Sequence, residues 1–359
     1  MKIAQVAPLY ESVPPKLYGG TERVVSFLTE ELVREGHEVD LFASGDSITQ
    51  ARLRPMCNEA LRLQGKKVID PLACHIRMIE LALQEAKDYD VVHFHVDYLH
   101  FPMSRREAVT AVTTLHGRLD IPELRPLYEE FTDVNLVSIS NAQRRPISWA
   151  NWVATVHHGL PARDFEPCYQ PGKYLAFLGR ICADKGIDQA IEIAKKADMP
   201  LKIAAKVDAA DQEYFESSIR KLLDHSLVEF VGEIGDHEKS EFLGNALALL
   251  FPINWPEPFG LAMIESMACG TPVIAYPRGS VPEVVDKRTG FIVHNAGEAT
   301  EAIAQASSFD RHLCRRVFEE RFTARRMCRD YLKVYKRLAG GMSLEPRKSA
   351  SSSEVSCVA

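Results

Sequence analysis

The sequence predicts an α/β protein in which strand–helix units build parallel sheets. Short apolar runs alternate along the chain with segments of helical periodicity, and this alternation is typical of parallel sheets with helical crossovers. The chain has 359 residues, which is long enough for two domains of ordinary size. Three prolines and a glycine gather between Pro161 and Gly172. We interpret them as a linker between a domain at residues 1–160 and a second domain at residues 161–322.

Residues 246–276 are the stretch whose pattern predicts its local structure in most detail. An apolar run at residues 246–251 predicts a buried strand. The three prolines that follow it exclude a regular ladder or helix before Gly260. Apolar residues then recur at helical spacing until Gly270, where a C-terminal glycine cap belongs. Because residues 273–276 are again apolar, the stretch predicts one strand–loop–helix–strand unit of a parallel sheet.

Two carboxylates in this stretch have different settings. Glu257 lies between two prolines, at the carboxyl end of the expected strand, where open α/β sheets bind ligands. Glu265 falls in the second turn of the expected helix, and its side chain leans toward the helix N-terminus. The helix start offers the free N–H groups of Phe259, Gly260 and Leu261 to hydroxyl or anionic oxygens. The arrangement predicts a site for a polyhydroxylated, phosphorylated ligand.

These residues resemble the Glu-x7-Glu signature of the family 4 retaining glycosyltransferases. The match consists of Glu257-Pro-Phe-Gly-Leu261, Glu265, Gly270-Thr-Pro-Val273 and Pro282-Glu283. The resemblance implies the GT-B architecture, in which two Rossmann-like domains face each other across a cleft. It also implies that the first glutamate lies against the donor sugar, that the second binds the nucleotide ribose, and that a last helix at about residues 323–339 crosses back to the first domain.

The start of the chain predicts a second part of the site. Residues 2–7 and 39–43 are expected strands, and residues 21–35 are an expected helix preceded by Gly19 and Gly20. Paired glycines before a helix allow backbone to approach a phosphate or a sugar, although a plain turn explains them as well. The resemblance implies that this loop faces the catalytic cleft.

Histidines follow two further expected strands, residues 90–95 and 109–116. His93 and His95 share one face of the first strand, but no acidic partner follows at ligand distance, so a metal site is not favoured. The resemblance implies that His116 is the active-site histidine of the family, in a neighbourhood that contacts the donor sugar. For His93 and His95, hydrogen-bonded polar groups near the cleft are an equally good interpretation.

Residues 136–140 are the next expected strand. An expected helix and a basic, aromatic cluster follow it. A helix is expected to open at Asn141. Arg144, Arg145, Trp149 and Trp152 form a basic, aromatic cluster there. This cluster could contact a membrane surface or the acceptor, or it could be a solvated face with tryptophans in the core.

The second half predicts a diphosphate site. An expected strand at residues 174–178 leads through Gly179 and Arg180 to Lys185 and Gly186 before a helix, and two cations at a helix start suit a pyrophosphate. The resemblance implies that Arg180 and Lys185 hold the donor diphosphate.

The expected strand at residues 201–207 departs from the family, because Lys206 and Asp208 stand where glycines are common. Lys206 either adds a charge near the phosphates or marks a reshaped loop. The expected strand at residues 228–231, with the segment that follows it to Ile234, resembles the base-binding segment of the family.

Composition limits the possible partners and compartments. A net charge of −6 gives no overall attraction to nucleic acid. Eight cysteines without a C-x-x-C pair favour a reducing cytoplasm over a disulfide framework or a zinc site. No stretch reaches the ~18 apolar residues that span a bilayer, so peripheral contact is the most that we expect at a membrane. Residues 340–359 are serine-rich and read as a disordered tail.

The resemblance implies transfer of a hexosyl unit from a UDP- or GDP-sugar to an acceptor hydroxyl, with retention at the anomeric carbon, and we expect no metal or other cofactor. Metal-dependent sugar transferases typically place Asp-x-Asp at the carboxyl end of a strand, whereas Asp88-Tyr-Asp90 lies at the entrance of one. Variable loops such as residues 44–71 would shape the acceptor pocket, and the acceptor itself stays open. The alternatives are a sugar-nucleotide epimerase, a glycosidase and a non-catalytic nucleotide-sugar-binding protein.

Overall fold

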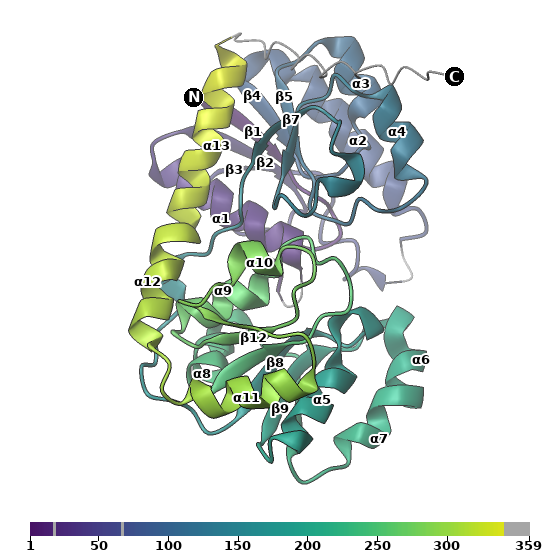
Figure 1. Ribbon diagram of the computed structural model, residues 1–359. Helices are drawn as coiled ribbons and strands as arrows, with labels where there is room; N and C mark the ends of the chain where they lie inside the picture. Colours follow the sequence, from purple (N-terminus) through teal and green to yellow (C-terminus); the bar gives the residue numbers. More distant parts are fainter. Residues whose placement is uncertain (17–18, 66–67, 341–359) are drawn as a thin grey trace, which may run out of the picture.

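The computed structural model describes residues 1–16, 19–65 and 68–340. The predicted tail therefore lies outside the described residues except for Gly340. The chain folds into two α/β units, each with its own sheet, which lie one above the other in Figure 1. Because every strand pairing in both sheets is parallel, each sheet needs helical crossovers between its strands.

The first unit contains a seven-stranded sheet in the order β3-β2-β1-β4-β5-β6-β7. Its strands are β1 (Lys2–Val6), β2 (Glu38–Ala43), β3 (Arg52–Pro55), β4 (Val91–Phe94), β5 (Ala111–Thr114), β6 (Leu136–Ser138) and β7 (Trp152–Thr155). Its helices are α1 (Gly20–Arg34), α2 (Pro71–Gln84), α3 (Phe101–Glu107) and α4 (Leu124–Glu130).

The second unit contains a six-stranded sheet in the order β10-β9-β8-β11-β12-β13. Its strands are β8 (Leu175–Arg180), β9 (Leu201–Lys206), β10 (Val228–Gly232), β11 (Ala248–Phe251), β12 (Val273–Ala275) and β13 (Gly290–Ile292). The helices that follow β8 in sequence are α5 (Ile187–Lys196), α6 (Gln212–Tyr214), α7 (Arg220–Leu223), α8 (Asp236–Gly244), α9 (Leu261–Ala268), α10 (Val281–Val284), α11 (Ala296–Ala306), α12 (Arg311–Arg321) and α13 (Ala324–Ala339).

The strand orders locate a ligand crevice in each unit. In the first sheet the order reverses between β1 and β4, and in the second it reverses between β8 and β11. Open α/β sheets bind ligands outside the carboxyl ends of the strands at such a point. The segments that leave β1 and β4 lead to Gly19 and His95, and those that leave β8 and β11 lead to Lys185 and Glu257. The topology therefore directs the predicted site residues to these two crevices.

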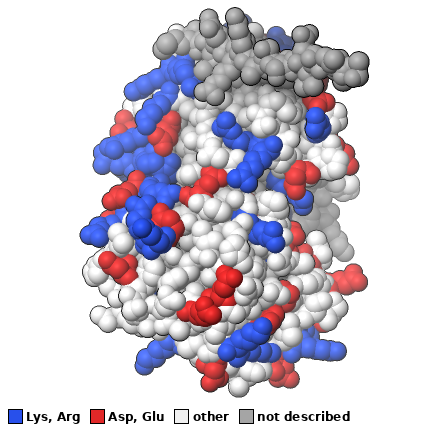
Figure 2. All heavy atoms as spheres, in the orientation of Figure 1, with Lys and Arg blue, Asp and Glu red and all other residues white. Residues whose placement is uncertain are grey.

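The last helix, α13, returns to the first unit. It packs on α1, and Met327, Tyr331 and Tyr335 are fully buried among side chains of the first sheet. In Figure 1 this yellow helix runs from the lower unit along one side of the upper unit. Its solvent side is basic, because Arg325, Arg329, Lys333 and Lys336 are exposed, and Lys and Arg gather on that flank in Figure 2. None of the described helices is both long enough and apolar enough to cross a bilayer.

The two chain segments that join the units lie side by side. Leu160 forms a parallel bridge with Thr323, and its N–H donates to the carbonyl oxygen of Phe322 at 2.8 Å. A Cβ atom on Gly159 would lie 2.2 Å from the carbonyl oxygen of Thr323. Only glycine therefore allows the two segments to approach this closely.

Three local expectations were wrong. The expected loop at residues 44–71 contains the edge strand β3 (Arg52–Pro55), whose charged residues hide the pattern of a buried strand. The helix expected at Asn141 is only a turn followed by a 3-10 helix at Arg145–Ile147, because Pro146 lacks an N–H and disfavours helix in the residue before it. Trp149 is 41% exposed rather than in the core.

Glu283 in α10 joins the second unit to the first. Its carboxylate accepts hydrogen bonds from the backbone N–H groups of Asn141 at 2.8 Å and Ala142 at 2.6 Å. The Nδ2 atom of Asn141 also donates to it at 3.0 Å, and His157 lies 3.4 Å away. Burial alone would raise the pKa of Glu283, but these donors outweigh it and lower the pKa to about 2.

This contact predicts a loss of stability in acid. The pKa of Glu283 falls from an ordinary 4.5 to about 2 in the folded protein. The stabilisation is therefore complete above the ordinary pKa and disappears as pH falls toward the folded-state value. Between about pH 5 and pH 3, wild type should lose on the order of 2 kcal/mol more unfolding free energy than Glu283→Gln.

Chemical denaturation across this pH range measures the difference. Glu129→Gln is the matched control, because Glu129 is 51% exposed and forms an ion pair with Arg125, one turn away in α4. That control should follow the wild-type curve. Parallel curves for wild type and Glu283→Gln would contradict the assignment of the contact.

Candidate active site

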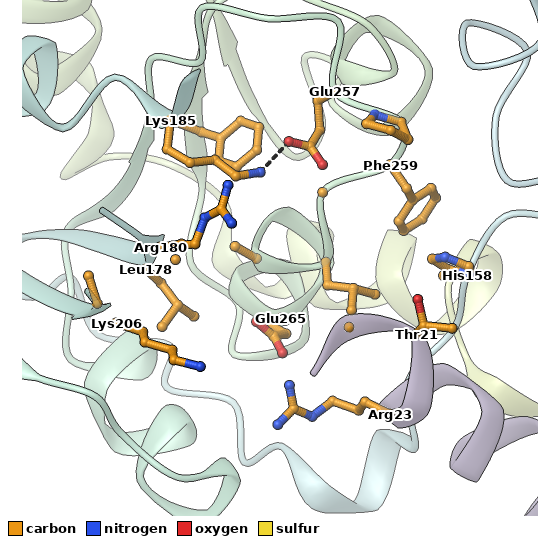
Figure 3. A pocket seen from close by; sticks show the side chains of 18 of the residues that line it. Thr21, Arg23, His158, Leu178, Arg180, Lys185, Lys206, Glu257, Phe259 and Glu265 are labelled. Atoms are coloured by element: carbon orange, nitrogen blue, oxygen red, sulfur yellow. Dashed lines mark hydrogen bonds and ion pairs between the residues drawn. The ribbon is translucent and has the colours of Figure 1, made fainter. Parts of the chain in front are cut away.

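A cavity of about 390 Å³ opens between the two units, and Figure 3 shows it from close by. Its volume falls in the range of small-molecule sites. Twelve of the predicted site residues line it: Gly20, His116, Gly179, Arg180, Lys185, Lys206, Ile234, Glu257, Phe259, Gly260, Leu261 and Glu265. Residues far apart in the sequence therefore meet at the crevices that the strand orders define.

Gly19 is not among the lining residues. A Cβ atom there would lie 2.7 Å from Cβ of Pro15. The packing against Pro15 therefore accounts for glycine at this position, whereas the next residue, Gly20, is the one that lines the cavity.

Glu257 lies in the irregular loop between β11 and α9. Its side chain is 10% exposed and forms an ion pair with Nζ of Lys185, which Figure 3 marks with a dashed line. The indole N–H of Trp255 donates to the same carboxylate at 3.0 Å. The backbone behind this loop is tightly packed, because a Cβ on Gly279 would lie 2.3 Å from the backbone N and O atoms of Glu257. The carboxylate is thus held in a fixed position.

Lys185 is fixed by the packing of two loops. The residue after it, Gly186, has φ +68°, and a Cβ there would lie 2.0 Å from the carbonyl oxygen of Pro252. The N–H of Asn254 donates to the carbonyl oxygen of Asp184 at 2.9 Å. The loop after β8 therefore rests directly on the loop after β11, which explains how a lysine and a glutamate 72 positions apart come together.

Arg180 is the last residue of β8 and carries acidic partners. Its guanidinium lies 3.5 Å from the carboxylate of Asp208 and 3.4 Å from that of Asp211. Lys206 also lies 3.0 Å from Asp208. The loop after β9 thus places carboxylates beside the predicted diphosphate ligands. An incoming anion must share these cations with the carboxylates or displace them.

Glu265 lies in the second turn of α9 and is 3% exposed. Its carboxylate forms an ion pair with Nζ of Lys239 at 2.7 Å. Lys239 in turn lies 2.9 Å from Asp236, which forms a 3.0 Å ion pair with Arg23. Arg23 comes from α1 of the first unit, so four alternating charges connect the two units along the cavity.

The N-terminus of α9 points at the cavity. Gly260, with φ +81°, precedes the helix, and no side chain caps its first turn. Gly260, Leu261 and Ala262 all line the cavity. The positive end of the helix dipole therefore faces the space that an anionic or hydroxylated ligand would occupy.

The histidines form a buried hydrogen-bonded network rather than a metal site. His95 bonds through Nδ1 to Nε2 of His116 at 2.9 Å and through Nε2 to the side chain of Gln5 at 2.9 Å. His93 bonds to Tyr335 and Thr114, each at 2.7 Å. His93 and His95 are thus polar groups with hydrogen-bond partners, which was one of the two interpretations of the sequence.

Burial keeps the histidines at the cavity wall and directly behind it neutral. It lowers the pKa of His116 to about 3 and that of His95 well below its ordinary value. His158 shows the same effect and stacks on His116 with ring centroids 5.3 Å apart. These side chains therefore act as neutral hydrogen-bonding or packing groups at physiological pH.

The sequence did not predict several of the residues that line the cavity. Trp255, Lys239, Arg23 and His158 all line the cavity. Trp255 had a detectable signal, because it lies in the same proline-rich loop as Glu257. Arg23 and Lys239 are ordinary charged residues at helix starts, and only the tertiary fold brings them together.

Within the described part of the chain, no three His, Cys, Asp or Glu side chains form a group that could hold a metal ion. Asp90 lies at the start of β4, where its carboxylate accepts a hydrogen bond from the backbone N–H of Lys2 at 2.8 Å. The carboxyl ends of the strands form the opposite edge of this parallel sheet. The Asp-x-Asp sequence is therefore remote from the cavity.

Comparison with known proteins identifies the class of protein to which this fold belongs. The solved structure of HepE from Anabaena in complex with UDP and glucose matches 93% of this chain and 99% of its own, with a TM-score of 0.70 and 18% identity. At that identity the likeness shows the fold, which is the GT-B fold of glycosyltransferases.

Two sequence families match consecutive parts of the chain. Residues 18–167 match the family described as Glycosyltransferase Family 4, and residues 162–317 match Glycosyl transferases group 1. The chain belongs to the family 4 glycosyltransferases.

Curated relatives span most of the chain. The O-antigen chain mannosyltransferase C of Escherichia coli is 24% identical over 92% of this chain and 98% of its own length. The alpha-maltose-1-phosphate synthase of Mycolicibacterium smegmatis is 27% identical over 83% of this chain and 86% of its own. The chain is therefore similar over most of its length to a mannosyltransferase and to a synthase of a sugar phosphate.

Proposed function

We propose that this protein transfers a hexosyl unit from a nucleotide diphospho-sugar, with UDP or GDP as the leaving group, to an acceptor hydroxyl. The observation that carries the proposal is the meeting of Lys185 and Glu257 in one cavity. A cation there suits the diphosphate, and a carboxylate beside it suits the sugar hydroxyls. HepE, which shares the fold, binds UDP and glucose in its solved structure.

The chemical step follows from the predicted roles. The bond between the anomeric carbon and the diphosphate oxygen breaks, and the acceptor oxygen forms its bond on the same face of the sugar. The acceptor proton passes to the departing phosphate oxygen. Lys185, Arg180 and the N-terminus of α9 would stabilise the negative charge that develops on the diphosphate. Glu257 and His116 would orient the sugar so that the reacting atoms stay close.

Glu265 has a different role from Glu257. It is buried in α9 and paired with Lys239, so it suits a binding group for the ribose hydroxyls rather than the second carboxylate of a glycosidase, which must lie opposite the first across the glycosidic bond. The acceptor would enter from the first unit and stays unspecified. The seven cysteines that the structure describes are free thiols, which supports the proposal of a reducing, cytoplasmic compartment.

Nucleotide binding tests this assignment. Glu265→Ala should weaken the binding of UDP or GDP by about 10-fold to 100-fold, because ribose hydrogen bonds to a charged group are lost. The loss should be the same whichever sugar is attached to the nucleotide. Isothermal titration with free nucleotides measures it, and a screen of nucleotide-sugars by thermal shift on wild type identifies the base.

The control for this experiment is Glu301→Ala, because Glu301 is an exposed residue of α11 outside the cavity. If Glu265→Ala binds the free nucleotide as tightly as wild type, the ribose assignment is wrong. If wild type binds no nucleotide or nucleotide-sugar, the proposed function itself is wrong.

A further inference from the structure

The ion pair between Arg23 and Asp236 joins the two units, and two further ion pairs connect it to Glu265 at the predicted nucleotide site. The side chain of Arg23 is 8% exposed, that of Lys239 is 8% exposed and that of Glu265 is 5% exposed, whereas Asp236 is 46% exposed. A buried charge that loses its partner is strongly destabilised. Lys239 therefore has to remain between Asp236 and Glu265. The loss of one ion pair should displace the side chain that forms the next pair.

Local structure fixes the two ends of this connection. Arg23 lies in the first turn of α1, where its N–H donates to the carbonyl oxygen of Gly19 at 3.3 Å. Asp236 is the first residue of α8, and Glu238 caps that helix by accepting from the N–H of Gly235 at 2.8 Å. Figure 3 shows the guanidinium of Arg23 directed toward the side of the cavity where Glu265 and Lys206 lie.

We propose that Arg23, Asp236 and Lys239 are positioning residues for Glu265, so that nucleotide binding by the second unit depends on an arginine of the first. The inference rests on the proposed function, because it takes Glu265 as the ribose-binding carboxylate. Lys239 holds one oxygen of that carboxylate at 2.7 Å, and Arg23 holds Lys239 in place through Asp236. Nucleotide affinity and contact between the units are then coupled, and each strengthens the other.

A direct contact between Arg23 and the diphosphate would be a different mechanism. Arg23 lines the cavity, and a guanidinium binds phosphate well. The two mechanisms differ in which part of the ligand reports the loss. A positioning role acts through the ribose and affects a nucleoside as much as its diphosphate, whereas a phosphate contact affects the diphosphate alone.

The experiment compares Arg23→Met, Asp236→Asn, their double variant and Lys239→Met by titration calorimetry. The probes are UDP and uridine, or GDP and guanosine if wild type binds GDP, with the nucleoside measured by competition. Asp133→Asn is the matched control, because Asp133 forms an ion pair with Arg105 on the surface and is 57% exposed. Asp236→Asn changes one half-exposed side chain without changing its shape, so it keeps the test valid if Lys239→Met fails to fold.

We expect Arg23→Met and Asp236→Asn each to weaken nucleotide and nucleoside by the same factor, about 3-fold to 10-fold, and the double variant to lose no more than the weaker-binding single variant. Lys239→Met should lose about 10-fold or more. The control should bind as wild type does.

Three results would overturn the inference. They are losses that multiply in the double variant, a loss seen with the diphosphate alone, and single variants that bind as wild type does. A wild type that binds neither nucleotide would instead refute the proposed function, so the two failures are distinguishable.

Discussion

Replacement of Glu257 by glutamine is expected to lower turnover by about two to three orders of magnitude while the protein still folds and is still stabilised by its donor. This size is typical for the removal of one preorganised charged group from an active site. Glutamine keeps the shape of the side chain, and its amide oxygen can still accept the 3.0 Å hydrogen bond from the indole of Trp255. The loss therefore reports the charge of Glu257 rather than its packing.

The ion pair between Glu257 and Lys185 also predicts how the substitution divides between KM and kcat. Glutamine removes the anion that Lys185 contacts, so the lysine should bind the donor diphosphate at least as well as before. We expect an unchanged or lower KM for the donor together with the lower kcat, which is the pattern of an interaction that matters mainly in the transition state.

The measurement is steady-state release of nucleoside diphosphate from the donor, with thermal shift as the binding control. Glu129→Gln is the matched variant, because Glu129 is 51% exposed in a surface pair with Arg125 on α4. It should retain wild-type rates. Unchanged turnover in Glu257→Gln would refute the catalytic role of this carboxylate.

The sequence predicted the parts of the fold that local patterns determine. Buried parallel strands such as β11 and β12 appear as short apolar runs, and their neighbours Gly260 and Gly270 have the positive φ angles that helix starts and ends often require. Most of the predicted site residues lie at or just beyond the carboxyl ends of parallel strands. Topology then gathered them, because parallel strands present their carboxyl ends at one edge.

The sequence did not predict contacts that depend on long-range geometry. Arg23 and Asp236 are 213 positions apart, and neither lies in a distinctive motif. Asp208 was noted only as a departure from the family and Asp211 was not singled out, yet both lie beside Arg180. The edge strand β3 was missed for a related reason, since an exposed strand with charged side chains lacks the alternation that a buried face imposes.

Transfer is expected to continue in excess EDTA, and this is the second large effect that we predict. A departing diphosphate needs positive charge from a metal ion or from fixed protein groups. Arg180, Lys185 and Lys206 all line the cavity, and the uncapped N-terminus of α9 adds its dipole. Arg180→Ala and Lys185→Met should each lower kcat/KM by about two to three orders of magnitude, far more than removal of metal.

Neutralising Asp208 should have the opposite effect to removing a cation, because it should strengthen nucleoside diphosphate binding. Asp208 lies 3.5 Å from Arg180 and 3.0 Å from Lys206, so it partly neutralises the cations to which we assign the diphosphate. Asp208→Asn should therefore tighten nucleoside diphosphate binding by about 2-fold to 10-fold, because two nearby cations lose a competing anion. An unchanged or weaker affinity in Asp208→Asn would indicate that these cations do not meet the diphosphate.

The decisive comparison is of initial rates for wild type, Arg180→Ala and Lys185→Met in EDTA, in Mg²⁺ and in Mn²⁺. Lys196→Met is the matched control, because Lys196 is 54% exposed in an i,i+4 pair with Glu192 on α5. If fixed cations carry the charge, wild type and the control have equal rates in all three media, and the two site variants stay slow in each. The opposite result, a wild-type rate that collapses on chelation and returns with metal while both variants remain active, would assign charge stabilisation to a bound ion and remove Arg180 and Lys185 from that role.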